Sequence, residues 1–511
     1  MAELTPMMQK YMETKEQYKD CILFYRLGDF YEMFFDDAIV ASKELEIALT
    51  GKSCGLEERA PMCGIPYHAV ETYLARLVSR GYKVAICEQV EDPKLAKGLV
   101  KREVIRVVTP GTNLDVQSLE ASKNNYLMCI AYTSDGIGIS AADVTTGDYY
   151  VTEVEDLRKL KDELMKYEPS EIICNEAFLV SGYDVEDLKS RLHMSVSSLE
   201  SHMFDDDGCR RILMRHFKVN TLIGLGVEEF PTGILAAGAL LQYLYDTQKT
   251  DLEHFTHISP YLTSKYMLLD SSTRRNLELT ETLREKQKRG SLLWVLDKTK
   301  TAMGGRLLRN YIEQPLIDKE EMEKRLDAIQ ELNQDSISRD EIREYLNPVY
   351  DLERLLSKVT YKTANPRDLI AFRNSLQMLP PIKTVLAGFQ KEELAAIREE
   401  IDGLEDIYQL IDEAIVEEPP ISIREGGMIK DQFDETIDHL RAAKHDGKQW
   451  LVQLEEEDRE RTGIKNLKIK KNNVFGYFFE VTNSYKDLVP EDYIRKQTLA
   501  NAERYTTPRL K

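Results

Sequence analysis

An aromatic ring and a carboxylate stand two positions apart in the run Phe30-Tyr31-Glu32. Alternate residues of a β-strand share a face, so Phe30 and Glu32 would project together and Tyr31 would face the opposite side. A ring can insert between stacked bases at a cost of roughly a few kcal/mol, which is smaller where a mispair already weakens the stacking. The carboxylate could accept from a base N–H or, when protonated, donate to a base nitrogen. The alternative is a core ring beside an edge-strand charge.

The elements that must position this run form a small α/β domain. Its expected elements are strands at 21–27, 30–34 and 83–89 and helices at 36–49 and 69–80. The strands are apolar and rich in β-branched and aromatic residues, and the helices carry an apolar stripe. A polar segment from Thr109 to Asn125 has the composition of a linker.

The hydrophobic periodicity of the rest of the chain changes twice between strand-like and helical patterns. This predicts a multidomain protein of mixed α/β and all-α type. Three strand-like runs between Tyr126 and Glu153 open a second α/β domain, and long helical patterns dominate after Pro231. Residues 428–461 predict one long helix of roughly 50 Å. Residues 466–471 and 475–481 predict a β-hairpin after it. The expected domains cover residues 1–112, 125–230, 231–425 and 426–511.

The charge balance restricts where nucleic acid could bind. The net charge is −20, so a partner polyanion would need local basic islands. One lies at 94–106, with five basic residues and one acid, and another at 465–511, with ten basic residues and five acids. The seven cysteines are scattered and form no CxxC pair, which indicates reduced thiols rather than a disulfide framework or a zinc site.

Several segments, in order along the chain, resemble the MutS family of DNA mismatch-recognition proteins. They are FYRLGDFYEMFFDDA at 24–38, PMCGIPYHAVETYLARLV at 61–78, KVAICEQVEDP at 83–93, VVTPGT at 107–112, LDSSTRRNLEL at 269–279, GSLLWVLDKTKTAMGGRLLRNYIEQPL at 290–316, RERTGIKNLKIKKNNVFGYFFEVT at 459–482 and YIRKQTLANAERYTTPRLK at 493–511. The resemblance implies a mismatch-binding domain, an RNase H-like connector, a lever and core of long helices, and a β-rich DNA clamp.

The resemblance also implies roles for particular residues. Phe30 would stack on a mispaired base and Glu32 would hydrogen-bond to it. Residues 64–68 would line the minor groove, with a simple strand-to-helix turn as the alternative. The further DNA-contacting residues implied are Gly64, Ile65, Pro66, Tyr67, His68, Lys94, Lys97, Lys468, Lys470, Lys471, Arg495, Lys496, Gln497, Thr498 and Asn501. Contacts to phosphates position the protein and carry no sequence information.

The partners implied are double-stranded DNA with mismatches or small loops, a MutL-type protein bound through the connector, and, in the full-length family, a second copy of the chain. A phosphate-binding G-x-x-x-x-G-K-[ST] loop is absent, because Glu46 stands where the first glycine of a match ending at Lys52-Ser53 would be. The Gly51–Ser53 segment is therefore predicted to be a loop. We expect a chain that stops before the family's ATPase domain, has no enzymatic activity, and holds neither ATP nor Mg²⁺ nor any metal.

Two other functions stay open at this point. Asp143, Asp148 and Glu153 lie on or beside expected strands and could bind Mg²⁺ in a structure-selective nuclease. A protein-interaction scaffold acting through the second domain is compatible with DNA binding. The N-terminus lacks an apolar signal-peptide core, and the apolar stretch at 233–245 is too short to cross a bilayer, so the expected location is cytoplasmic and nucleoid-associated.

Overall fold

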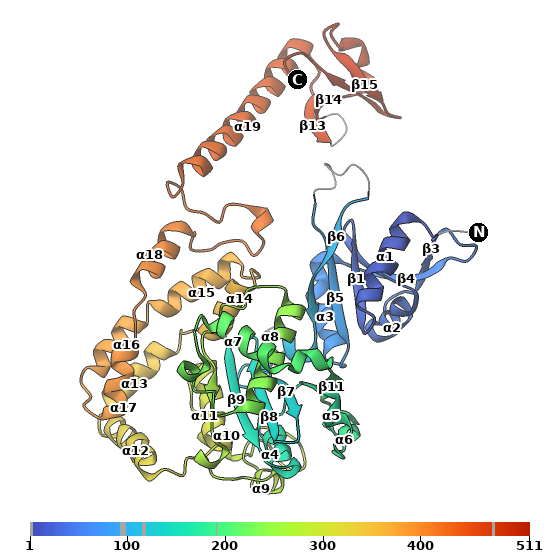
Figure 1. The fold of residues 1–511 in the computed structure, drawn as a ribbon. Helices are drawn as coiled ribbons and strands as arrows, with labels where there is room; N and C mark the ends of the chain where they lie inside the picture. The colour runs from blue at the N-terminus through green and yellow to red at the C-terminus, as the bar shows by residue number, and fades with distance from the viewer. Residues whose placement is uncertain (1–3, 92–98, 115–118, 191, 473–475, 511) are drawn as a thin grey trace. The chain divides into compact units, whose positions relative to one another are not determined.

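The protein is described by a computed structural model that covers residues 4–91, 99–114, 119–190, 192–472 and 476–510 (Figure 1). It divides into two units. The first comprises Met1–Ile411 with Ile421–Ile423, and the second comprises Asp412–Pro420 with Arg424–Lys511. Within the described ranges, the first unit holds two six-stranded sheets and a helical segment, and the second holds a long helix and a four-stranded sheet.

The first sheet, blue in Figure 1, has the strand order β3-β4-β2-β1-β5-β6. Its strands are β1 (Cys21–Leu27), β2 (Phe30–Phe34), β3 (Thr50–Lys52), β4 (Ala60–Pro66), β5 (Lys83–Gln89) and β6 (Arg102–Val108). Helix α1 (Pro6–Gln17) packs Met8 and Tyr11 against one face. Helices α2 (Phe35–Leu45) and α3 (Val70–Val78) cover the other face. The three expected strands are confirmed, because each has the apolar content needed to be buried between two helical layers.

The second sheet has the order β11-β10-β7-β8-β9-β12 and also has helices on both faces. Its strands are β7 (Leu127–Tyr132), β8 (Ile137–Asp143), β9 (Asp148–Val154), β10 (Glu171–Cys174), β11 (Ser195–Ser198) and β12 (Ser259–Pro260). Helices α7 (Asp206–Phe217) and α8 (Pro231–Gln248) pack on one face. The other face carries α4 (Leu157–Tyr167), α5 (Glu176–Leu179) and α6 (Val185–Ser190).

Helix α8 belongs to this second sheet. It is buried on nearly every side, and Ala236, Leu240 and Leu244 lie in one core with strands β7, β8 and β9. A helix that is apolar all round has to be enclosed, and the sheet supplies the surface that encloses it. The all-helical segment expected from residue 231 therefore begins only after α8 and β12.

The segment after β6, expected to be a linker, is packed between the two sheets over its first residues. Thr109 and Gly111 are buried and donate hydrogen bonds to the Glu171 carboxylate, the Gly111 amide at 3.1 Å. The Tyr243 hydroxyl donates to the same carboxylate at 2.7 Å, and the Lys83 ammonium lies 3.6 Å away. This buried carboxylate therefore holds β5, the connection and α8 together.

The helical segment consists of ten helices in the described part of the first unit and its border with the second. They are α9 (Ser271–Asn276), α10 (Leu292–Leu296), α11 (Ala302–Glu313), α12 (Lys319–Gln334), α13 (Ser336–Leu346), α14 (Leu352–Thr360), α15 (Pro366–Leu376), α16 (Leu379–Leu386), α17 (Glu392–Glu400) and α18 (Glu405–Ala414). Across the described residues, no helix is both long and apolar enough to cross a membrane.

In the second unit, helix α19 (Glu435–Thr462) is followed by a sheet of order β13-β14-β16-β15. The strands are β13 (Lys468–Asn472), β14 (Gly476–Thr482), β15 (Ile494–Thr498) and β16 (Ala502–Thr506). The helix expected from Met428 begins seven residues later, because Asp434 caps it by accepting from the Ile437 amide. The chain continues helically through Gly447. The antiparallel pairing of β13 and β14 confirms the expected hairpin.

Candidate nucleic-acid interface

Phe30 lies on the surface, at the first residue of β2. Its side chain is 48% exposed, whereas Tyr31 is 4% exposed and belongs to the core under α2 and α3. Glu32 shares the face of Phe30, which is the face that α1 covers farther along the strand, where Tyr11 contacts the Phe34 ring. Phe30 therefore projects from a rigid sheet beyond the edge of the helix that buries its neighbours.

On the opposite face of β2, hydrogen bonds and ring contacts around Tyr31 hold the strand in place. The Tyr31 hydroxyl donates to the Glu88 carboxylate, and the Arg26 guanidinium donates to it at 3.0 Å. The Arg26 guanidinium also lies 3.8 Å from the centre of the Tyr67 ring. Burial, and then the hydrogen bond to Glu88, raise the pKa of Tyr31, so its hydroxyl stays a donor. These contacts fix β2 against β1, β5 and the loop after β4.

The segment 64–68 flanks Phe30 and Glu32 through strand pairing. Gly64 pairs with Glu32 and Pro66 pairs with Phe30, and the Tyr67 amide donates to the Asp29 carbonyl at 3.0 Å. The side chain of His68 is exposed, but that of Ile65 is fully buried in the core. Ile65 is therefore a core residue, contrary to the expectation that it would contact DNA, whereas Gly64, Pro66 and Tyr67 are half-buried.

The basic island at 94–106 is only partly available for contacts to phosphate. Lys94 and Lys97 lie outside the described residues. Lys101 pairs with Glu103 at 2.6 Å. Arg106 donates to Gln248 at 3.1 Å and to the Thr112 carbonyl at 2.9 Å. Arg106 is therefore a structural contact between the first sheet and α8, contrary to the expectation that it would meet phosphates.

In the second unit, the sheet brings together several residues expected to contact DNA. Lys468 and Lys470 share a face with Glu480, Arg504 and Gln497 through strand register. The further exposed residues expected to contact DNA are Lys471, Arg495, Lys496, Thr498 and Asn501. The face of Lys468 and Lys470 thus carries cations from β13 and β16, whereas the register places Lys471 and Arg495 on the opposite face of the sheet.

Some of these cations are already paired. The Lys470 ammonium lies 2.7 Å from Glu480, and its hydrogen bond lowers the pKa of that carboxyl. Gln497 accepts from Arg504 at 2.8 Å. Arg495 lies 3.6 Å from Glu503. Among the described residues, no ion pair is found for Lys468, Lys471 or Lys496, so these three lysines are the strongest candidates for phosphate contact.

The carboxylates that could have served a nuclease have structural roles. Glu153 accepts from the amides of Thr232 and Gly233 at 2.5 and 2.9 Å, at the first turn of α8. Asp143 and Asp148 both accept from the Asn124 amide at 2.9 Å. Burial, and then the nearby Asp143, raise the pKa of Asp148. No group of three potential metal ligands occurs within the described ranges, and nothing supports the nuclease interpretation.

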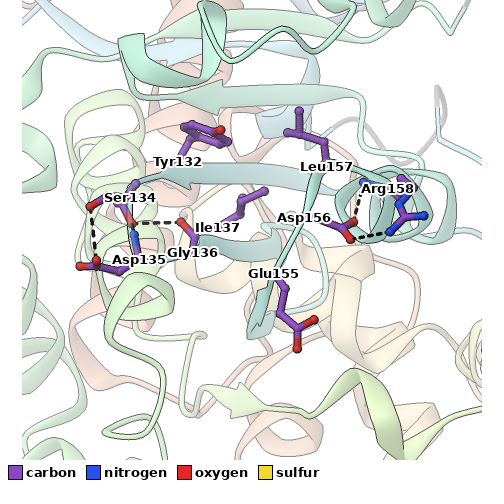
Figure 2. A pocket seen from close by; sticks show the side chains of 10 residues that line it. Tyr132, Ser134, Asp135, Gly136, Ile137, Glu155, Asp156, Leu157 and Arg158 are labelled. Atoms are coloured by element: carbon purple, nitrogen blue, oxygen red, sulfur yellow. Dashed lines mark hydrogen bonds and ion pairs between the residues drawn. The ribbon is translucent and has the colours of Figure 1, made fainter.

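A surface pocket of about 570 Å³ lies on the second sheet, between the β7–β8 turn and the start of α4 (Figure 2). Its acidic lining residues are Asp135, Glu155 and Asp156. Asp156 is occupied as the cap of α4, accepting from the amides of Arg158 and Lys159 at 2.8 and 2.9 Å. With three carboxylates and one cation, Arg158, in its lining, the pocket is net acidic and disfavours the binding of phosphate.

Sequence reasoning missed Lys52, which stands in the segment predicted to be a loop. That segment is the edge strand β3, and the Lys52 ammonium lies 2.5 Å from a carboxylate oxygen of Glu32. The strand order β3-β4-β2 brings the two side chains together. No local pattern signals this contact, because it depends on which strand pairs with β4.

Comparison with known proteins gives consistent matches along the chain. MutS domain I matches residues 5–117, MutS domain II matches 125–258, and MutS domain III matches 272–501. The domain II match ends at residue 258, after α8 and just before β12, in agreement with the packing of that helix.

Curated relatives match over the whole chain. DNA mismatch repair protein MutS of Lachnoclostridium phytofermentans is 66% identical over 511 residues, which is 100% of this chain and 55% of the relative. The proteins of that name from Ruminiclostridium cellulolyticum and Acetivibrio thermocellus are each 54% identical, over 100% of this chain and 58% and 59% of their own lengths. The chain thus spans little more than half the length of these relatives. The ordered domain matches and these identities show that the chain belongs to the MutS family of DNA mismatch repair proteins.

Proposed function

We propose that this chain recognises mispaired or unpaired bases in double-stranded DNA and so initiates mismatch repair. The observation that carries the proposal is the exposure of Phe30, 48%, on a strand whose other aromatic side chains are buried. An exposed ring on a rigid sheet is suited to insertion because little conformational freedom is lost when it enters the stack.

Discrimination would come from the cost of kinking the duplex. Inserting a ring unstacks one base step, at roughly a few kcal/mol, and a mispaired step is the cheapest to unstack. Glu32, on the same face, would accept a hydrogen bond from the displaced base. The flanking segment from Gly64 to His68 would lie along the minor groove, with the Ile65 side chain serving only the core.

The four-stranded sheet of the second unit would act as the clamp. Lys468, Lys471 and Lys496 would contact phosphates, and Lys470, Arg495, Gln497, Thr498 and Asn501 would add contacts from the same sheet. Such contacts supply affinity without sequence information, and they make binding strongly dependent on salt concentration.

We further propose assignments that the family resemblance suggests. The second sheet and its helices would be the RNase H-like connector, which engages a MutL-type partner. Dimerisation, ATP binding with Mg²⁺, and ATP hydrolysis would belong to the longer family protein. This chain would bind DNA without enzymatic activity, in the cytoplasm and in association with the nucleoid.

The proposal is tested by fluorescence anisotropy at fixed salt, with a duplex carrying a G·T mismatch and its matched counterpart. We expect tighter binding to the mismatched duplex, and loss of this preference in Phe30→Ala. Ile39→Ala is a suitable control, because Ile39 is 49% exposed on α2 of the same domain and is not part of the proposed interface. A preference that is equal in Phe30→Ala and in the unmodified chain would overturn the assignment of the wedge.

A further inference from the structure

The ion pair between Lys52 and Glu32 joins the edge strand β3 to the strand that carries Phe30. The Lys52 ammonium lies 2.5 Å from Oε2 of Glu32, and the two side chains are 34% and 17% exposed. The pair is therefore partly shielded from water, where an ion pair is stronger than one on a fully exposed surface.

The intervening strand β4 is shaped to allow this contact. Gly64 pairs with Glu32, and a Cβ built on Gly64 would lie 3.5 Å from Cγ of Glu32. The absence of a larger side chain at Gly64 leaves the carboxylate open toward β3. The Lys52 ammonium also lies 5.5 Å from the centre of the Phe34 ring, which is itself buried. A cation near a ring face is stabilised there. The Lys52 ammonium is therefore held both by the Glu32 carboxylate and by the Phe34 ring.

The two oxygens of the Glu32 carboxylate have different surroundings. Oε2 accepts from Lys52. Among the described residues, no hydrogen bond reaches Oε1. Holding one oxygen restricts the side-chain rotamers of Glu32 before any ligand binds, and this reduces the ordering cost on binding. The ammonium also offsets the repulsion between the carboxylate and the phosphates of an approaching duplex.

We propose that Lys52 is a positioning residue for Glu32, which fixes Oε2 so that Oε1 can accept from a mispaired base. The inference rests on the proposed function, because it assigns a means of discrimination to the same site. Lys52 would thus determine the preference for mismatched over matched DNA without touching the mispair itself.

The test is a double-mutant cycle on the ratio of mismatched to matched affinity, measured with the chain at fixed salt. Lys52→Met keeps the aliphatic stem over Phe34 and removes the charge. We expect it to lower the ratio by about ten-fold, the loss typical of one hydrogen bond to a charged group. Lys52→Arg, which keeps the cation, should restore most of the ratio. In a Glu32→Gln background, Lys52→Met should have little further effect on the ratio, because the carboxylate through which Lys52 acts is already absent.

Lys10→Met is the matched control, since it removes an exposed lysine from an ion pair with Glu13 in the same domain. Lys52→Met could instead lower the affinity for both duplexes equally, reduce the salt dependence of binding, and do so undiminished in the Glu32→Gln background. That result would overturn the proposal and make Lys52 a phosphate contact. An unchanged ratio in Lys52→Met, with the preference abolished in Phe30→Ala, would overturn this inference alone. An unchanged ratio in Phe30→Ala would instead overturn the proposed function.

Discussion

A Cβ built on Gly138 would stand 1.9 Å from the carbonyl oxygen of Thr232. Gly138 lies in β8 and Thr232 in the first turn of α8, so the start of the helix rests directly on the backbone of the strand. The Glu153 carboxylate of the neighbouring strand accepts from the amides of Thr232 and Gly233, at the positive end of the helix dipole. The close contact between the Gly138 and Thr232 backbones and the interaction of Glu153 with the helix N-terminus together place α8 on the second sheet.

Gly138→Ala should therefore destabilise the protein strongly. The obstructing atoms belong to backbone, which cannot move aside without lifting α8 from its sheet, so we expect a loss of roughly 3 kcal/mol or more in the free energy of unfolding. Urea unfolding followed by circular dichroism measures it. Gly224→Ala is the control, because a Cβ at Gly224 meets nothing within 4 Å. Equal midpoints for the two variants would contradict the close approach.

Truncation of the two phenylalanines of β2 should affect the stability of the protein to very different extents. Phe34 is 1% exposed and packs against Tyr11, so Phe34→Ala should cost about 3–5 kcal/mol. Phe30 is 48% exposed, so Phe30→Ala should change stability by less than about 1 kcal/mol. Chemical denaturation of both variants checks this difference. A large loss in Phe30→Ala would show that the ring supports the fold and would weaken its assignment as a wedge.

The features that sequence could reveal are those with a local period. Alternation along β2 is visible in the residue types, so the shared face of Phe30 and Glu32 could be predicted. The partner of Glu32 could not, because Lys52 reaches it only through the strand order β3-β4-β2. Helix α8 was recognisable as apolar, but the sheet that it covers is set by tertiary packing. Likewise, the charge of Arg106 was visible, whereas its contacts with Gln248 and Thr112 were not.

Lys496 provides a test of the clamp. It is exposed on β15, so Lys496→Ala should lower affinity for matched and mismatched duplexes by the same factor. The slope of log affinity against log salt should fall by about one. Lys319→Ala, at an exposed lysine of α12 that is paired with Glu323, should leave the slope unchanged. A change confined to the mismatched duplex would be inconsistent with a contact to phosphate.

Glu313 should make stability depend on pH. Burial raises its pKa from 4.5 to about 7, although Arg309, which donates at 3.2 Å, acts in the opposite direction. Glu168 adds to the rise, while Arg274 and Lys123 oppose it.

Because the folded state binds this proton more tightly than the unfolded state, the stabilisation is fully present below pH 4.5 and is lost as pH rises through about 7. The loss is on the order of 2–3 kcal/mol. Glu313→Gln cannot ionise, so the free energy of unfolding of the unmodified chain, minus that of the variant, should fall between pH 5 and pH 8. Urea titrations of both proteins across this range measure the difference. Parallel stability curves would mean that Glu313 ionises equally easily in the folded and unfolded chain, and hence that the surrounding cations fully offset its burial.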